Sequence, residues 1–225
     1  MTARVDHLVV AAASLEEGAA WCEATLGVVP HAGGEHVFMG THNRLLRIAT
    51  VDYPRAYFEI IAVQPGRTPQ RERRWFDLDD ESLRDALRRS GPRLVHFVAC
   101  VPDVRAAVAR WETLGIERGE VVEASRMTAR GLLQWQITIR PDGQRLFDGV
   151  LPTLIEWGAT HPAPALPESG VTLHALTATH PEAARLRTAW DAIALQRVAL
   201  KEGPANLCAV LDTPRGRVKL ESLGL

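Results

Sequence analysis

Histidine and glutamate recur as pairs along this chain of 225 residues, with the histidine in an apolar run that opens a segment and the glutamate in one that closes it. The three pairs are His7 with Glu59, His96 with Glu156, and His174 with Glu221. Imidazole nitrogens and carboxylate oxygens are common ligands of divalent transition metals, and a carboxylate can also act as a general base. The recurrence therefore predicts a metal site or an acid–base site assembled from repeated modules.

Strand alternation indicates where the first glutamate points. Glu59 shares one face of its strand with Tyr57 and Ile61, while Phe58 and Ile60 cover the other face. A carboxylate in a strand that is apolar on both faces is costly to bury unless it is paired, protonated or bound to a metal ion. Glu59 is therefore a candidate ligand or base.

The second glutamate lies in a similar strand. Glu156 has Leu154 beside it, and Ile155 and Trp157 lie on the opposite face. Histidine and glutamate together suit zinc, nickel, cobalt, manganese or iron. The repeated pairs predict a site for one such divalent ion with four ligands: His7, Glu59, His96 and Glu156.

Each of these residues also has a structural explanation. A single strand histidine is more often a hydrogen-bonded core residue than a ligand, and Glu59 could form an ion pair with Arg44. The third pair fits a solvated strand, because Glu221 shares its face with Lys219. We expect Glu221 at the surface and His174 without a clear partner.

The elements that would position the pairs form three βαβββ modules. Ser14 and Glu17 predict a capping box for the first helix, and Asp103 and Pro181 mark the starts of the equivalent helices. Strands are expected over residues 36–40 and 117–123, among others. The predicted organisation is a first module over 1–65, a linker with a short helix over 66–93, a second module over 94–157, a proline-containing linker over 158–170 and a degenerate third module over 171–225.

Composition excludes several classes of protein. With 26 Lys and Arg against 27 Asp and Glu, the formal net charge is -1, which gives no drive towards nucleic acid or an anionic membrane. The three cysteines are widely spaced, and we expect reduced thiols in a cytoplasmic protein without a signal peptide or a membrane span. The expected partner is a small-molecule substrate or ligand, and a homodimer is one open arrangement.

Three segments resemble the vicinal oxygen chelate superfamily, and more narrowly its glyoxalase-like domain proteins. They are Asp6–Val10, Tyr57–Ile61 and His36–Leu45. The resemblance implies an α+β fold in which two βαβββ modules pair to make a curved, cup-shaped mixed sheet, here with an extra third module. It also implies metal ligands from the first and fourth strands of each module, which are again His7, Glu59, His96 and Glu156. The third module could cap an open edge of this sheet or pair with a module of another chain.

The resemblance implies proton transfer on a small molecule, as in an isomerase, epimerase or lyase, with Glu59 or Glu156 as the base. On that hypothesis, Glu156→Gln abolishes turnover. His36, Asn43 and Gln136 are candidate substrate-binding residues; turn chemistry explains His36 and Asn43 equally well, and Gln136 faces the cup only if the apolar face of its strand packs on a helix. The alternative function is a non-catalytic small-molecule-binding protein of the same fold.

Overall fold

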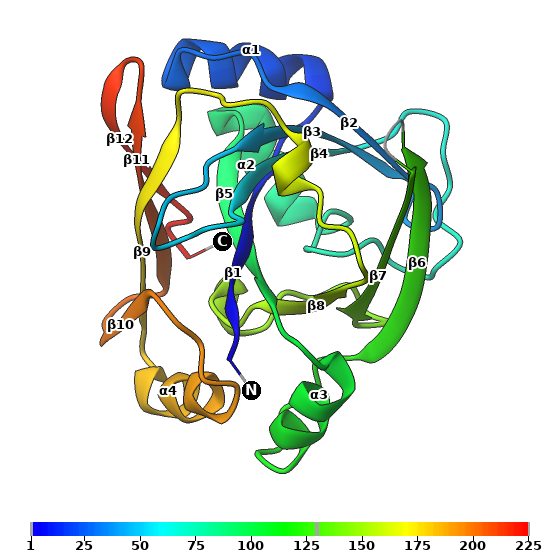
Figure 1. Cartoon of the computed structure of the whole chain (residues 1–225), viewed down its shortest axis with the longest axis vertical. Coiled ribbons are helices and arrows are strands. Elements are labelled where there is room, and N and C mark those ends of the chain that lie inside the picture. The colour runs from blue at the N-terminus through cyan, green and yellow to red at the C-terminus, as the bar shows by residue number, and fades with distance from the viewer. Residues whose placement is uncertain (1, 129–130, 225) are drawn as a thin grey trace.

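The computed structural model describes residues 2–128 and 131–224. Its largest element is an eight-stranded sheet in the order β2-β3-β4-β1-β5-β8-β7-β6, which curls into an open half-barrel (Figure 1). The strands are β1 (Arg4–Ala11), β2 (His31–His36), β3 (Thr41–Arg47), β4 (Tyr57–Val63), β5 (Arg93–Cys100), β6 (Glu120–Thr128), β7 (Gly131–Ile139) and β8 (Thr153–Trp157).

Two modules with the same strand pairing build this sheet. In the first, β1 runs parallel to β4, and in the second, β5 runs parallel to β8. The modules join where β1 and β5 pair antiparallel at the centre. The predicted α+β fold of repeated βαβββ modules forming a curved mixed sheet is confirmed.

Four α-helices accompany the strands in the described residues: α1 (Leu15–Leu26), α2 (Glu81–Ser90), α3 (Val104–Glu112) and α4 (Ala183–Ala192). The side chain of Ser14 accepts a hydrogen bond from the Glu17 backbone N–H, so the predicted cap starts α1. Gly27 ends this helix at φ 78°, in the left-handed region that glycine adopts freely. No helix among the described residues has the length and apolar character needed to cross a membrane.

A third unit repeats the β-α-β-β-β order with β9 (Thr172–His180), α4, β10 (Val198–Glu202), β11 (Asn206–Thr213) and β12 (Gly216–Glu221). These strands form a separate sheet in the order β10-β9-β11-β12. Leu173, Leu207 and Leu211 of this sheet share an apolar cluster with Leu8 and Phe97 of the two central strands. The third unit therefore covers the convex face of the large sheet and caps neither of its edges, which are β2 and β6.

The segment between the first two modules enters the concave side of the sheet. Trp75, Phe76 and Leu78 are buried there in one apolar cluster with Val9 and Ile137. Phe76 has φ 59°, which is a strained conformation for a bulky residue and is held only because its surroundings fix it. The aromatic residues of this segment close much of the floor of the cup, which restricts where a ligand can bind.

Two predicted strands are shifted in the structure. The strand expected over residues 36–40 is β2 (His31–His36), and the one expected over 117–123 is β6 (Glu120–Thr128). The first shift arises because β2 contains Gly33 and Gly34, which read as a turn in the sequence. Both glycines have a specific role, described below.

Candidate active site

A β-bulge in β1 builds the centre of the site. The pairing of β1 with β5 shifts register between Val5 and His7, so Asp6 is the extra residue. A bulge re-aims the side chains around it, and here the Asp6 carboxylate reaches the neighbouring imidazole. His7 Nδ1 donates to Asp6 Oδ1 over 2.7 Å, which leaves His7 Nε2 directed away from Asp6.

Asp6 accepts two further hydrogen bonds, one from the Trp157 indole Nε1 and one from His161 Nε2, each at 2.9 Å. The donor role of His161 follows because its Nδ1 accepts from the Ala163 backbone N–H. Burial opposes ionisation of Asp6, but the hydrogen bonds and charges of His161 and His7 outweigh it and hold the Asp6 pKa well below its ordinary value. Asp6 is therefore a buried carboxylate that fixes the orientation and tautomer of His7.

Glu59 faces His7 from β4. Its Oε1 accepts from Asn43 Nδ2 over 2.5 Å, and its Oε2 lies 3.6 Å from His7 Nε2. Both side chains are almost completely buried. A substrate group that contacts both Nε2 and Oε2 would meet an acid and a base side by side, so the pair is arranged for proton transfer.

Asn43 also fixes the tautomer of His36. The Asn43 Oδ1 accepts from the Gly34 backbone N–H, so its Nδ2 group donates to Glu59 and approaches His36 Nε2 at 3.3 Å. His36 Nδ1 then donates to Thr41 Oγ1 over 3.0 Å. Gly33 is needed because a Cβ there would lie 2.0 Å from Asn43 Oδ1.

Burial lowers the pKa of His36 from its ordinary 6.5 to about 4, although the nearby Glu59 carboxylate acts in the opposite direction. The unfolded chain takes up a proton at this histidine below about pH 6.5, whereas the folded protein does so only near pH 4. The free energy of unfolding should therefore fall by about 3 kcal/mol from this group between those two pH values, and be unaffected by it above pH 6.5. Urea unfolding at a series of pH values measures the slope.

The matched variant for this measurement is His36→Gln, which keeps hydrogen-bonding groups and does not titrate. Its stability should decline less steeply between pH 6.5 and 4 than that of the parent protein. Burial and the charge of Arg118 also lower the pKa of His96. This histidine is present in both proteins, so its contribution to the pH dependence cancels in the comparison. Parallel curves for the two proteins would contradict a neutral buried His36.

In the second module, the structure places His96 and Glu156 away from the His7–Glu59 pair. His96 Nδ1 donates to the Gly149 carbonyl over 2.8 Å, and its Nε2 accepts from the Thr153 backbone N–H over 3.0 Å. The Glu156 carboxylate accepts from the Val104 backbone N–H at the start of α3, on the convex side of the sheet. Both predicted ligands are therefore committed to other contacts.

The strand register identifies the true counterpart of Glu59. Glu59 lies opposite Val9 on the neighbouring strand, two residues after His7. In the second module, the residue two positions after His96 is Val98, and it lies opposite Thr153. A threonine thus occupies the position of the second carboxylate, and the second half-site lacks a glutamate.

The predicted set of four metal ligands does not fit this geometry. His96 has no free ring nitrogen, and Glu156 lies on the wrong face of β8. Within residues 2–128 and 131–224, no group of three or more His, Cys, Asp or Glu side chains is arranged to hold a metal ion.

Gln136 is also outside the cup. On β7, Ile137 and Ile139 belong to the concave cluster, with Trp135 packed against it, so Gln136 points to the other face. The prediction depended on the apolar face of β7 packing on a helix. That face packs instead on the aromatic residues of the 66–93 segment inside the cup. The glutamine face of β7 therefore points out of the cup.

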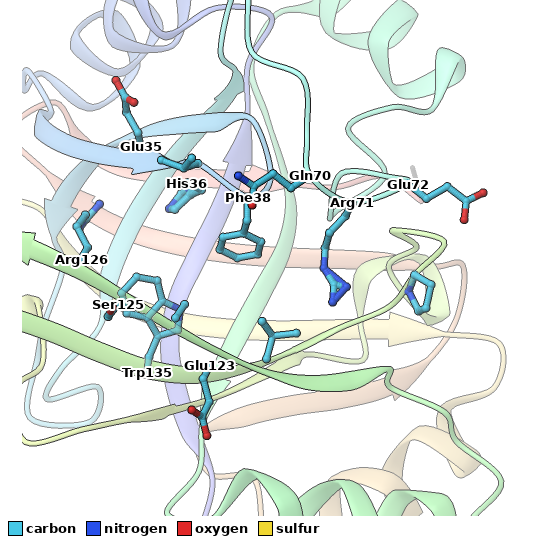
Figure 2. Close-up of a pocket in the computed structure, with 14 residues that line it drawn as sticks. Glu35, His36, Phe38, Gln70, Arg71, Glu72, Glu123, Ser125, Arg126 and Trp135 are labelled. Carbon is cyan, nitrogen blue, oxygen red and sulfur yellow. The ribbon is translucent and has the colours of Figure 1, made fainter.

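Two hollows with shared lining residues lie on the side of the sheet that carries the His7–Glu59 pair. A cavity of about 40 Å³ is bordered by His7, His36 and Glu59. It shares His36, Arg126 and Trp135 with a pocket of about 650 Å³. Figure 2 shows this larger pocket between the β2 residues and the β6–β7 hairpin, so the two edge strands of the half-barrel form its walls.

Sequence reasoning missed Asp6, His161 and Arg126. Asp6 was visible only as a neighbour of His7, and alternation places it on the opposite face. His161 comes from the linker after β8, where nothing in the sequence ties it to β1. For Arg126 a signal existed, since a Gly-Gly pair within a strand often marks the close approach of another group.

A curled sheet of two βαβββ modules, with the His7–Glu59 pair on its concave face, defines a protein of the vicinal oxygen chelate type. The model of the glyoxalase-like domain family matches residues 5–194, and the chain belongs to that family. No curated protein matches the sequence.

The chain is also similar to several solved structures. A hypothetical protein from Staphylococcus aureus has a TM-score of 0.62 at 12% identity, covering 90% of this chain and 87% of its own. Streptomyces coelicolor methylmalonyl-CoA epimerase, in complex with 2-nitronate-propionyl-CoA, has a TM-score of 0.44 at 21% identity, covering 72% and 99%. The Mycobacterium tuberculosis methylmalonyl-CoA epimerase has a TM-score of 0.38 at 19% identity, covering 72% and 91%.

Proposed function

We propose that this protein is an enzyme that moves a proton on a carbon atom next to a carbonyl group of a small molecule. The observation that carries the proposal is the buried pair of His7 Nε2 and Glu59 Oε2, 3.6 Å apart at the inner end of a pocket. A hydrogen bond on the side away from the pair fixes each partner: His7 donates to Asp6, and Glu59 accepts from Asn43. Such support fixes an acid and a base in a productive geometry.

In the proposed step, the Glu59 carboxylate takes the proton from the substrate carbon and becomes a carboxylic acid. The electron pair of the broken C–H bond moves to the carbonyl oxygen, which accepts a hydrogen bond or a proton from Nε2 of the doubly protonated His7. Asp6 stabilises the positive charge of His7 when that imidazole carries both protons. Return of a proton to the carbon, on either face, completes an epimerisation or an isomerisation without a net change in atoms.

Exchange of substrate hydrogen for deuterium tests this step without knowledge of the natural substrate. A panel of small carbonyl compounds is incubated with the protein in D₂O, and loss of the C–H signal is followed by proton NMR. Glu59→Gln should slow the exchange by at least about a hundredfold, since it removes the base.

Glu156→Gln is the matched control, because Glu156 lies on the other face of the sheet and its carboxylate accepts a hydrogen bond from the Val104 backbone N–H at the start of α3. It should retain the exchange rate of the parent protein within about twofold. Equal losses in the two variants, or full activity of Glu59→Gln, would overturn the proposal.

A binding protein without catalysis is the second candidate. The large pocket has an apolar lining that includes Val37, Phe38 and Trp135, and it would hold a ligand without engaging the smaller cavity. That function predicts retention of a ligand with no exchange of any compound in the panel. The Glu59→Gln variant would then bind the same ligand as the parent protein.

A further inference from the structure

We propose that Arg126 binds a carboxylate group of the substrate, which makes the substrate class small carboxylates with an apolar body and a carbonyl group. This inference rests on the proposed function and adds the feature that selects the substrate. Within the described chain, Arg126 is the only arginine or lysine that borders both the small cavity and the large pocket. An anion bound there would lie close to the His7–Glu59 pair.

Arg126 has no hydrogen bond or ion pair with any residue that the structure describes. Its neighbours in the pocket are already engaged. Glu35 lies 3.7 Å from Arg67, and Glu123 lies 3.8 Å from Arg105. The half-buried guanidinium is therefore a cation without a counterion, at a position where an incoming carboxylate can accept two parallel hydrogen bonds.

The other basic residue of the pocket differs in this respect. Arg71 donates to the Glu120 carboxylate through Nη1 over 2.6 Å and also through Nη2. Figure 2 shows Arg71 at the end of the pocket away from His36, and Arg126 at the end near it. Arg71 is therefore neutralised and distant from the reacting groups, which makes it a matched comparison.

The fold reserves space for the Arg126 side chain. A Cβ built on Gly34 of β2 would lie 1.7 Å from Arg126 Nη1, so any other residue at position 34 would require the guanidinium to move from its place beside β2. The positive charge reaches the inner cavity, since Arg126 contributes to lowering the pKa of His36, after burial and against the effect of Glu59. Position and charge thus both direct Arg126 towards the proposed reaction centre.

The pocket between Arg126 and solvent suits an apolar substrate body. Val37 and Phe38 of the β2 end face Val122, Ala124 and Trp135 of the opposite hairpin across a volume of about 650 Å³. This space accommodates an aromatic or branched aliphatic group. The carboxylate would sit at the inner end, and the carbonyl would reach His7.

Isothermal titration with a matched pair of probes tests the inference. The probes are benzoylformate, which has an apolar ring, a carbonyl and a carboxylate, and its neutral methyl ester. The parent protein should bind benzoylformate at least about tenfold more tightly than the ester. Arg126→Gln should weaken benzoylformate binding by at least about tenfold and leave ester binding unchanged, whereas Arg71→Gln should change neither.

Benzoylformate has no hydrogen on a carbon next to its carbonyl, so its binding does not depend on proton transfer. Glu59→Gln should keep the preference for benzoylformate over the ester. If Arg126→Gln binds benzoylformate as the parent does, or if the parent shows no preference or no binding at millimolar concentrations, the carboxylate site is wrong. If the preference is confirmed but no compound exchanges deuterium, the site stands and the proposed proton transfer fails.

Discussion

The Asp6→Asn variant is expected to lose between about a hundredfold and ten-thousandfold in deuterium exchange, the upper figure being the loss when the carboxylate behind the histidine of a catalytic triad becomes an amide. Asp6 accepts three hydrogen bonds, from His7, His161 and Trp157. An asparagine keeps one accepting oxygen and brings an NH₂ group, which must face one of these N–H donors. Turning His7 to its other tautomer relieves that conflict by removing the hydrogen on Nδ1, but the imidazole then has no carboxylate to stabilise its doubly protonated form, which is the form that donates a proton from Nε2 in the proposed step.

Asp6 does not touch the substrate in this scheme, so it is a positioning residue. The test must therefore separate loss of orientation from loss of fold. Nitrogen-15 NMR of His7, assigned with a His7→Gln variant, should show a changed tautomer in Asp6→Asn, while urea unfolding shows that the protein remains folded at the assay temperature. Asp85→Asn, at a partly exposed position on α2, serves as the control for a simple change of charge.

An unchanged tautomer together with an unchanged exchange rate would contradict the role of Asp6. So would a rate loss that is fully explained by unfolding. A slower rate with an altered tautomer and a folded protein supports it.

The first half of the site was predictable because β4 has a regular pairing. Glu59 shares its face with Tyr57 and Ile61, and the structure places this face on the concave side of the sheet. His36 and Asn43 also line the inner cavity next to Glu59, as the sequence predicted for cup-lining residues. Whether they bind substrate stays a prediction.

The bulge in β1 explains why Asp6 was not found. Alternation assigns consecutive residues to opposite faces, but the register shift between Val5 and His7 breaks that rule at this position. A bulge is a property of the pairing between β1 and β5, which lie far apart in the sequence. The local sequence around Asp6 therefore gives no indication of the bulge.

The second half of the site was assigned to the wrong face for a different reason. Strand β8 is apolar on both sides, so alternation separates Ile155 from Glu156 without saying which of them faces the cup. The resemblance to related proteins supplied that choice and selected Glu156. The structure places Ile155 in the concave cluster and Glu156 at α3, because Trp75 and Phe76 fill the cup with apolar side chains and require an apolar wall.

Because Trp75 and Phe76 fill the cup, the second large expected effect is a loss of about 3 kcal/mol in the free energy of unfolding for Phe76→Ala. Phe76 is 4% exposed, stacks on Trp75 with ring centroids 5.2 Å apart, and lies 5.2 Å from the His96 ring. Removing its ring leaves a cavity between the two modules that the packed sheet cannot close. The cavity would expose the His96 side of the cup, which Phe76 now separates from the His7–Glu59 pair.

Phe147→Ala is a matched control for this variant, because it places the same alanine at a similarly strained backbone. The φ angles are 59° at Phe76 and 51° at Phe147, so the conformational cost of the substitution is shared. Phe147 is only half-buried, at a surface where it contacts Arg185, and its loss should cost about 1 kcal/mol. Urea unfolding with unchanged m-values measures both effects. Equal losses in the two variants would show that backbone strain, and not the packing of the cup by the 66–93 segment, sets the stability of this region.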